Sequence, residues 1–336
     1  SEVSGRKREF RMKKVLVTGA TGLLGNNIVR LLVDDGVSVR AAVRSTSNRK
    51  PFEGLSIEVV PIDFEDVESL KRAVDGVDVV IHSAGFIWFG WMKLEESRRA
   101  NVEYSRRLAD ICREKEVRFV HISTVDTLPA SDGKTPISED STGFEKPPCN
   151  YVVSKTEAER AVEAVIQKGL DAVIVHPGLF LGPWDWRPSS GELIRAIKKL
   201  GYFFTCPTGG ISVSDVRDVA RGTLLAAQKG EAGRHYILGG ENVHYKHLCR
   251  EIATRCGVAT PRLRTGPIAY LVASTTAAIN RARGNETLVN TAAIRMARYS
   301  HFYSSERAKV ELGYQWRPLN ETLDEAIEWL SANNKL

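Results

Sequence analysis

The chain has 336 residues, of which 43% are apolar and 26% charged, the balance of a soluble globular enzyme with one large domain or two coupled ones. Its net charge is +6, but residues 1–14 hold six Lys and Arg against two Glu and so account for +4 of it. The rest of the chain is left near +2, which argues against a nucleic-acid-binding face, so the expected partner is a small-molecule substrate.

The first segment, residues 1–11, reads as a basic flexible extension without the apolar stretch of a signal peptide. The longest apolar run, residues 268–279, is too short to cross a bilayer, so no integral membrane segment is expected. Five scattered cysteines show neither CxxC spacing nor a disulfide framework. These features favour a reducing, cytoplasmic location and predict no metal site.

From residue 13 to residue 176, short apolar β-rich runs alternate with helical stretches. The expected strands cover 13–18, 37–43, 56–62, 77–83, 117–123 and 170–176. The expected helices between them cover 23–34, 66–75, 93–115 and 152–167. Repeated alternation with continuous apolar strands is typical of a parallel sheet that helices bury on both faces. The sequence therefore predicts an α/β chain built on a Rossmann-type doubly wound parallel sheet.

Beyond residue 176 the rhythm changes to loops rich in Pro, Gly and aromatic residues, with further helices after them. Those helices are expected over 218–228, 244–255, 267–282, 304–312 and 320–333. We expect an NADP-binding Rossmann domain over 12–176, to which 212–240 returns. A smaller C-terminal substrate-binding part is expected from 177–211 and 241–336.

Directly after the first strand, the stretch VLVTGATGLLG places three glycines at the opening of the first helix. Their spacing is GxxGxxG, and glycines at such a turn allow a tight bend and a close backbone approach. The helix N-terminus offers N–H groups and a positive dipole to a pyrophosphate. A structural turn without a ligand is the alternative. The residues expected to bind the cofactor here are Gly19, Thr21, Gly22, Leu23, Leu24 and Gly25.

The end of the second strand indicates which dinucleotide is bound. A chain that prefers NAD usually has Asp or Glu there for the ribose hydroxyls, whereas this chain has Arg44, with Asn48 and other polar residues after it. A guanidinium suits the 2′-phosphate of NADP(H) through charge-assisted hydrogen bonds. NADP(H) is therefore the preferred cofactor, with NAD(H) second. A solvated basic loop is the alternative interpretation.

The third and fourth strands end in further candidate cofactor contacts. Asp63 can accept a hydrogen bond from an adenine amino group, and Phe64 can pack on the adenine ring. The small residues Ser83, Ala84 and Gly85 would let the backbone lie near the nicotinamide ribose.

Two titratable side chains lie four residues apart in YVVSK, so on a helix Tyr151 and Lys155 share one face. The fifth strand ends upstream in two hydroxyls, Ser123 and Thr124. A carbonyl that accepts a hydride from a reduced nicotinamide develops negative charge on its oxygen, which must be stabilised and protonated. Tyr151 can give this proton, and a nearby Lys155 ammonium would lower the pKa of Tyr151 towards neutrality.

Six motifs resemble those of the extended short-chain dehydrogenase/reductases, within the NAD-dependent epimerase/dehydratase superfamily. In chain order they are TGATGLLG, Asp63-Phe64, HSAG, Asn101, YVVSK and HPGLFLGP. The resemblance covers about residues 12–333. The stretches VRSTSNRK, GRHYILGGENV and FYSSERAKVELGYQWRP look most like the dihydroflavonol-reductase-like branch, which includes hopanoid-associated sugar epimerases. The resemblance also implies a homodimer formed through two long helices, here 93–115 and 152–167.

By this resemblance Thr124 is the catalytic hydroxyl, with Ser123 in reserve, and Tyr151 and Lys155 complete the catalytic set. Asn101 resembles a structural and proton-relay Asn of the family, with a plain helix-surface amide as the alternative. The resemblance implies further cofactor contacts from Asn101, Ser123, Tyr151, Lys155, Pro177 and Gly178.

Aromatic side chains gather where a substrate would enter. The stretch FIWFGWM directly follows the fourth strand, and LGPWDW follows the sixth. The residues expected to contact the substrate are Phe86, Trp88, Trp91, His176 and Trp184. For the tryptophans, filling a seam between the two parts of the chain is the alternative, and for His176 it is a hydrogen-bonded structural imidazole.

The sequence thus predicts an NADPH-dependent oxidoreductase that reduces a ketone, or oxidises a secondary alcohol, on a mainly apolar small molecule. A nucleotide-sugar epimerase or dehydratase with tightly bound NAD(P) is the alternative. Relatives of that kind often have Asn-Pro where this chain has His176-Pro177, and an Arg or Lys where it has GYFFTCPTGG. A further alternative is a non-catalytic NADP(H) sensor, against which the intact Thr124, Tyr151 and Lys155 argue.

Overall fold

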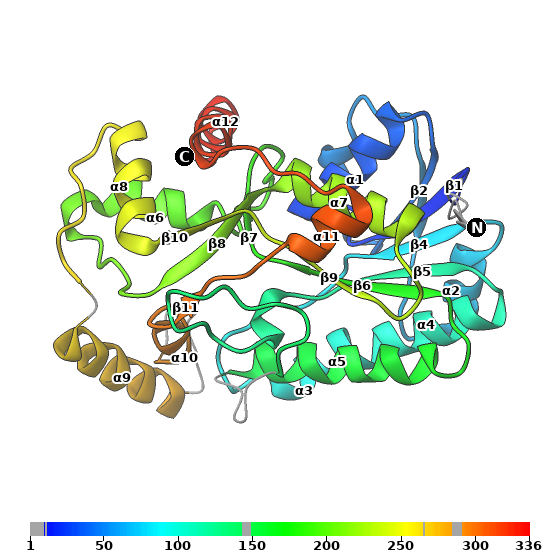
Figure 1. The fold of residues 1–336 in the computed structure, drawn as a ribbon, viewed down its shortest axis with the longest axis horizontal. Coiled ribbons are helices and arrows are strands. Elements are labelled where there is room, and N and C mark those ends of the chain that lie inside the picture. Colours follow the sequence, from blue (N-terminus) through cyan, green and yellow to red (C-terminus); the bar gives the residue numbers. More distant parts are fainter. Residues whose placement is uncertain (1–9, 11, 143–148, 265, 284–290) are drawn as a thin grey trace, which may run out of the picture.

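The computed structural model describes residues 10, 12–142, 149–264, 266–283 and 291–336, so most of the predicted extension lies outside it. Its centre is a seven-stranded sheet in the order β3-β2-β1-β4-β5-β6-β9, in which all neighbours run parallel (Figure 1). The strands are β1 (Lys14–Thr18), β2 (Ser38–Val43), β3 (Glu58–Pro61), β4 (Val79–His82), β5 (Arg118–Ile122), β6 (Ala172–Pro177) and β9 (His235–Leu238). The order reverses between β1 and β4, which confirms the predicted doubly wound Rossmann-type sheet.

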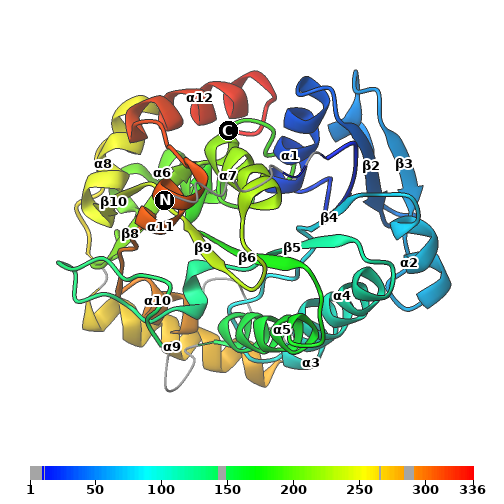
Figure 2. The same cartoon turned by 45° about the vertical axis from the view of Figure 1, so that its right-hand side comes forward.

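Two layers of helices cover the sheet because successive strand residues point to opposite faces. In β1, Val15 and Val17 pack in one core cluster, whereas Leu16 packs in a second one on the other face. The first cluster includes side chains of α1 (Leu23–Asp34), α7 (Val216–Lys229) and α11 (Glu306–Leu312). The second includes side chains of α2 (Val67–Val74), α4 (Tyr104–Glu114) and α5 (Asn150–Ile166). Figure 2 shows the sheet between the two layers.

The helix predicted over 93–115 consists of three parts. α3 (Leu94–Arg98) passes into a π-helical turn, Arg99–Glu103, which continues into α4. Such turns interrupt the regular hydrogen bonding of a helix and occur frequently at functional sites. This one holds Asn101, whose side chain is buried.

Most of the C-terminal helices pack around a second, smaller sheet (Figure 1). Its strands are β7 (Leu179–Leu181), β8 (Gly210–Asp215), β10 (Glu241–His244) and β11 (Ser300–His301), and β8 pairs with the other three. A third core cluster joins this sheet to α6 (Glu192–Leu200), α8 (Tyr245–Arg255) and α12 (Leu319–Ala332). In the segment 212–240, α7 and β9 join the main sheet as expected, but β8 does not, because it pairs with β7.

The remaining helices are α9 (Pro267–Ala282) and α10 (Thr291–Met296), with short 3-10 turns at Lys50–Phe52, Val125–Thr127 and Gly201–Phe203. Within the described ranges, no helix has the length and apolar character needed to cross a membrane. All five cysteines are free thiols. The helix that carries the predicted catalytic pair, α5, has 17 residues.

Candidate active site

The turn between β1 and α1 is shaped by its glycines. Gly19 has a φ of +66°, and a Cβ there would lie 2.6 Å from backbone atoms of Ser83 and Ala84, just after β4. A Cβ on Gly25 would lie 2.2 Å from the carbonyl oxygen of Gly19. Gly22 precedes the first turn of α1, and its position provides no side-chain cap for the helix N–H groups. These N–H groups and the close backbone approach fit the pyrophosphate of a dinucleotide.

The other predicted residues of this turn contribute differently. Leu23 and Leu24 are buried and hold α1 against the sheet, while Thr21 is half-buried. Only the backbone N–H groups of the two leucines are therefore suited to meet a cofactor.

Buried polar contacts hold the end of β4 beside the glycine turn. Thr18 Oγ1 lies 2.8 Å from His82 Nδ1, and the N–H of Ala84 donates to Thr18 Oγ1 at 3.3 Å. His82 Nε2 lies 3.0 Å from Ser105 Oγ. Burial, with a smaller contribution from a nearby ammonium, lowers the pKa of His82 to about 3, so its ring is neutral at pH 7. Residues 83–85 are thus fixed at the position where the strand order reverses, the usual place for a ligand in such a sheet.

The residues predicted to meet the adenosine end follow β2 and β3. Arg44 comes directly after β2 and is exposed, and so is Asp63 after β3. Asn48 and Asp63 each accept a hydrogen bond from the backbone N–H two residues further on, both at 2.9 Å. The Phe64 ring stacks on Tyr104, with 4.9 Å between ring centres. Because β2 and β3 are parallel neighbours, Arg44 and Asp63 lie at the same edge of the sheet.

The predicted catalytic side chains meet at the end of β5. Tyr151 lies in the first turn of α5 and is half-buried, with its phenol beside the Thr124 side chain. Thr124 caps the short helical turn that follows, with Oγ1 accepting from the N–H of Asp126 at 3.2 Å. One helical turn beyond Tyr151, Lys155 is buried, and its Nζ donates to the carbonyl oxygen of Ile122 at 2.7 Å.

The pKa of Tyr151 shifts in the direction opposite to the one predicted from the sequence. Burial raises the pKa of Tyr151, and the Asp126 carboxylate adds to this, while the Thr124 side chain opposes it. The Lys155 ammonium is directed at a backbone carbonyl instead of the phenol. Burial lowers the pKa of Lys155 to about 8, and the Glu159 carboxylate opposes that shift. The expectation of an acidified phenol is therefore wrong, because burial disfavours the phenolate and the ammonium is directed at the Ile122 carbonyl oxygen.

Ser123, the reserve choice for the catalytic hydroxyl, points in another direction. Its Oγ donates a hydrogen bond to the carboxylate of Glu159, and both residues are buried. Thr124 is therefore the hydroxyl that contacts the phenol.

Asn101 connects two segments of the site. Its Oδ1 accepts from the N–H of Phe86 at 2.7 Å, and its Nδ2 donates to the carbonyl oxygen of Phe86 and to Ser154 Oγ, both at 2.9 Å. The amide is thus engaged with the chain after β4 and with α5. This geometry makes Asn101 a structural residue, and the alternative of a helix-surface amide is wrong.

Part of the predicted aromatic group lies beside the catalytic phenol. The Phe89 ring centre is 5.4 Å from that of Tyr151. The Lys93 ammonium lies 5.9 Å from the ring centre of Phe86 and 4.5 Å from that of Trp88. The chain after β4 therefore provides an aromatic wall of Phe86, Trp88 and Phe89, of which the Phe89 ring packs on Tyr151.

Two other predicted substrate contacts are Trp184, which packs against neighbouring side chains, and Trp91, which is exposed. The Arg30 guanidinium lies 3.2 Å from the ring centre of Trp184, whose ring also contacts those of Trp186 and Trp329. The structure thus places Trp184 in a packing contact between α1 and α12, which corrects its predicted substrate role. Trp91 is 41% exposed.

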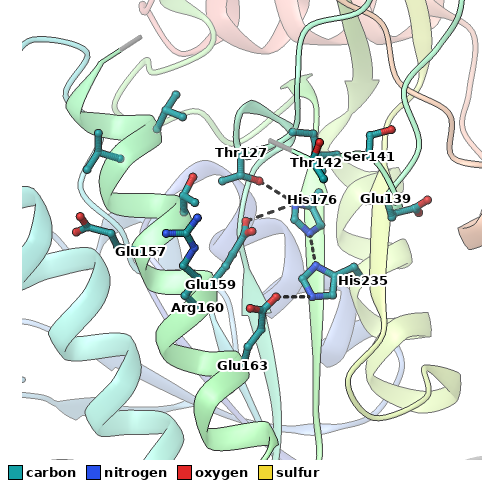
Figure 3. A pocket seen from close by; sticks show the side chains of 14 residues that line it. Thr127, Glu139, Ser141, Thr142, Glu157, Glu159, Arg160, Glu163, His176 and His235 are labelled. Carbon is teal, nitrogen blue, oxygen red and sulfur yellow. Dashed lines mark hydrogen bonds and ion pairs between the residues drawn. The ribbon is translucent and has the colours of Figure 1, made fainter. Parts of the chain in front are cut away.

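His176 is also placed differently from the prediction, against the backbone of Thr124. Its ring is buried, with Nδ1 3.1 Å from the Thr124 carbonyl oxygen and Nε2 2.9 Å from His235 Nδ1. Both residues line a separate pocket of about 540 Å³ between α5, β6 and β9 (Figure 3). The structural-imidazole alternative therefore describes His176 better than a substrate contact. The adjacent Pro177 ends β6, and a Cβ on Gly178 would lie 2.8 Å from a backbone oxygen of β8.

Comparison with known proteins agrees with this geometry. The model of the NAD dependent epimerase/dehydratase family matches residues 15–239, which include the glycine turn, the end of β4 and the helix of Tyr151 and Lys155. The chain belongs to this family. It is an NAD(P)-dependent enzyme of the extended short-chain dehydrogenase/reductase type, as the motifs predict.

Reductase-like and epimerase-like proteins both occur among the relatives of this family member. A protein of Synechocystis named after dihydroflavonol 4-reductase is 31% identical over 93% of this chain and 93% of its own length. The sterol demethylase protein B of Methylococcus capsulatus is 32% identical over 75% of this chain and 77% of its own. A nucleoside-diphosphate-sugar epimerase from Pseudomonas aeruginosa, known from its crystal structure, is 25% identical in sequence to this chain. The two structures are similar with a TM-score of 0.79, and the match covers 96% of this chain and 99% of the epimerase chain.

Two acidic residues of the site are absent from the set predicted by sequence. Asp126 Oδ2 accepts from the Thr124 hydroxyl at 3.2 Å, and its Oδ1 lies 3.8 Å from His301 Nδ1. Glu159 accepts from Ser123 and lies 3.6 Å from His176 Nδ1. The available signal for Glu159 is its position four residues after Lys155 on the same helix face.

Proposed function

We propose that the protein is an NADPH-preferring carbonyl reductase, or in reverse an alcohol dehydrogenase, that acts on a mainly apolar ketone or secondary alcohol. The position of the Tyr151 phenol beside the Thr124 side chain, after the end of β5, carries this proposal. The pair lies at the carboxyl edge of the sheet, which the glycine turn and residues 83–85 share. The Phe89 ring packed against Tyr151 supports an apolar substrate.

The chain's own residues supply the proton chemistry. A bound nicotinamide supplies the hydride in this reaction class. Thr124 would hold the carbonyl oxygen of the substrate, and the Tyr151 phenol, protonated because burial raises its pKa, would donate its proton to that oxygen. Lys155, buried one helical turn beyond Tyr151 with its ammonium at the end of β5, would bind the ribose hydroxyls on the nicotinamide side.

Two observations support the cofactor and the substrate class. The exposed Arg44 after β2 suits a 2′-phosphate, which only NADP(H) has. The names of the two sequence relatives refer to a dihydroflavonol and to a sterol, and both compounds are mainly apolar. The aromatic wall of Phe86, Trp88 and Phe89 fits such a substrate.

A nucleotide-sugar epimerase or dehydratase is the second candidate, and the similarity to the solved epimerase over nearly the full chain favours it. Such an enzyme would keep its nicotinamide bound and consume no net NADPH. The stretch GYFFTCPTGG before β8 contains no Arg or Lys to bind a diphosphate, which supports the reductase.

Turnover assays separate the two candidates. We expect NADPH oxidation with members of a panel of steroid, flavonoid and isoprenoid ketones, and no conversion of nucleotide sugars. In Tyr151→Phe, turnover should fall by about 100-fold or more while NADPH affinity stays unchanged, because only the proton donor is lost. Tyr202→Phe, at a 43% exposed tyrosine, serves as the matched control and should match the wild type. Wild-type turnover in Tyr151→Phe would refute the proposed general acid.

A further inference from the structure

The pocket of about 540 Å³ contains a second group of converging side chains (Figure 3). Glu159 from α5, His176 from β6 and His235 from β9 each offer a ligand atom, and these atoms all lie within 4.8 Å of one another. Two imidazole nitrogens and a carboxylate oxygen are a ligand set that Zn²⁺ takes in proteins. The geometry points to a binding site for a divalent transition-metal ion of the zinc class at these three residues.

The hydrogen-bond partners of His176 place its proton on Nδ1. The Thr124 carbonyl oxygen, at 3.1 Å from Nδ1, can only accept a hydrogen bond. Thr127 Oγ1, at 3.3 Å, gives its own hydrogen to the same carbonyl and so can also only accept from the ring. Glu159 Oε1, at 3.6 Å, is a third acceptor. In the neutral ring, Nε2 therefore presents a lone pair towards His235.

In the same way, the hydrogen-bond partner of the His235 ring, Glu163, places a proton on Nε2 of His235. His235 Nε2 lies 3.2 Å from a carboxylate oxygen of Glu163, so this nitrogen carries a hydrogen and Nδ1 presents a lone pair. The two lone pairs then face each other across 2.9 Å, from His176 Nε2 to His235 Nδ1. Two acceptors at this distance repel, so a positive charge, either a proton or a metal ion, is required there.

The surroundings favour a metal ion in this position. Metal-bound histidines usually donate their second N–H to a backbone carbonyl or a carboxylate, as His176 does to Thr124 and His235 does to Glu163. The pocket gives an ion access from solvent, because the His235 and Glu163 side chains are 23% and 42% exposed. Glu159, 12% exposed, has Oε1 occupied by Ser123 and His176 Nδ1, so its other carboxylate oxygen is left as the third ligand, and three protein ligands leave a position for water.

Metal titration of the purified full-length protein, after treatment with a chelator, tests this site. We expect isothermal titration calorimetry with ZnCl₂ to show one ion bound per chain, and Co²⁺ to develop the visible absorption of a site with nitrogen ligands. His235→Asn and Glu159→Gln should each weaken zinc binding about 100-fold or more. Glu163→Gln replaces the outer carboxylate with an uncharged, weaker amide acceptor and should weaken binding about 10- to 100-fold.

The surface pair of His247 and Glu251, with 3.8 Å between Nδ1 and Oε1, provides a matched control. His247→Asn should bind zinc like the wild type, which separates the pocket from adventitious binding at a histidine beside a glutamate. Absence of zinc binding in the wild type, or equal affinity in wild type and His235→Asn, would overturn the proposal and leave a shared proton between the imidazoles. If His235→Asn fails to fold, as circular dichroism would show, the milder Glu163→Gln decides. No step uses NADPH or a ketone, so the result is independent of the proposed reductase activity.

Discussion

Arg44 is the residue on which the proposed preference for NADP(H) depends. It follows β2 directly, its side chain is exposed, and Asp63 occupies the corresponding place after the neighbouring strand β3. A planar guanidinium binds a phosphate through two parallel hydrogen bonds, and it has no comparable partner in the ribose hydroxyls of NADH. Under our proposal, Arg44 would therefore discriminate between the two dinucleotides through one phosphate group.

Replacing this side chain tests the discrimination. In Arg44→Ala we expect NADPH binding to weaken about 10-fold or more, the cost of losing a hydrogen bond to a charged group, with NADH affinity little changed. Fluorescence titration with each dinucleotide measures both affinities. Arg195→Ala, at an exposed arginine on α6, should change neither. Equal weakening for NADPH and NADH would remove the argument for a 2′-phosphate contact.

The π-helical turn between α3 and α4 shows how one element organises the site. It places the buried Asn101 amide against the backbone of Phe86 on one side and against Ser154 of α5 on the other. Phe86 begins the aromatic wall and Ser154 lies next to Lys155. The turn therefore fixes the wall relative to the helix that carries the proton donor.

Removing the Asn101 hydrogen bonds should lower the free energy of unfolding. Asn101→Ala leaves the Phe86 N–H and carbonyl groups without their side-chain partner, and we expect the free energy of unfolding to fall by about 1–3 kcal/mol. Urea unfolding monitored by circular dichroism measures this change. Asn320→Ala, at an exposed asparagine on α12, should stay within about 0.5 kcal/mol of the wild type. If the free energy of unfolding of Asn101→Ala also stayed within about 0.5 kcal/mol of the wild type, the Asn101 amide would not be a structural connection.

The burial of Lys155 links the stability of the whole molecule to pH. Burial lowers the pKa of Lys155 to about 8, whereas a lysine in an unfolded chain titrates near pH ~10.4. Between these values the unfolded chain binds more protons than the folded one, so the contribution of Lys155 to the free energy of unfolding rises with pH. Below pH ~8 both states carry the proton and this contribution stays constant.

Comparison with Lys155→Met isolates this effect, because the other titrating groups are common to both proteins. The difference in free energy of unfolding, wild type minus variant, should be flat from pH ~6 to ~7.5 and should rise between pH ~8 and ~10. Urea unfolding in buffers across this range measures it. A difference that stays constant up to pH ~10 would show that Lys155 titrates normally in the folded protein.

The fold was predictable where the signals are local. The helix predicted over 23–34 is α1, Leu23–Asp34, because a glycine turn and an apolar period lie within a few residues of each other. The smaller sheet could not be predicted, because β7 has three residues and β11 only two, which is too short for a period-two pattern. The homodimer expected through 93–115 and 152–167 stays a prediction.

The sequence by itself determined the alternation of strands and helices, the glycine turn, and the placing of Tyr151 and Lys155 on one helix face. Each of these depends on residues a few positions apart. Only the tertiary structure decided that Thr124 faces the phenol, and that His176 meets His235, which is 59 positions away. Strand order and register create such contacts, and these arise from packing across the whole chain rather than from any local stretch of it.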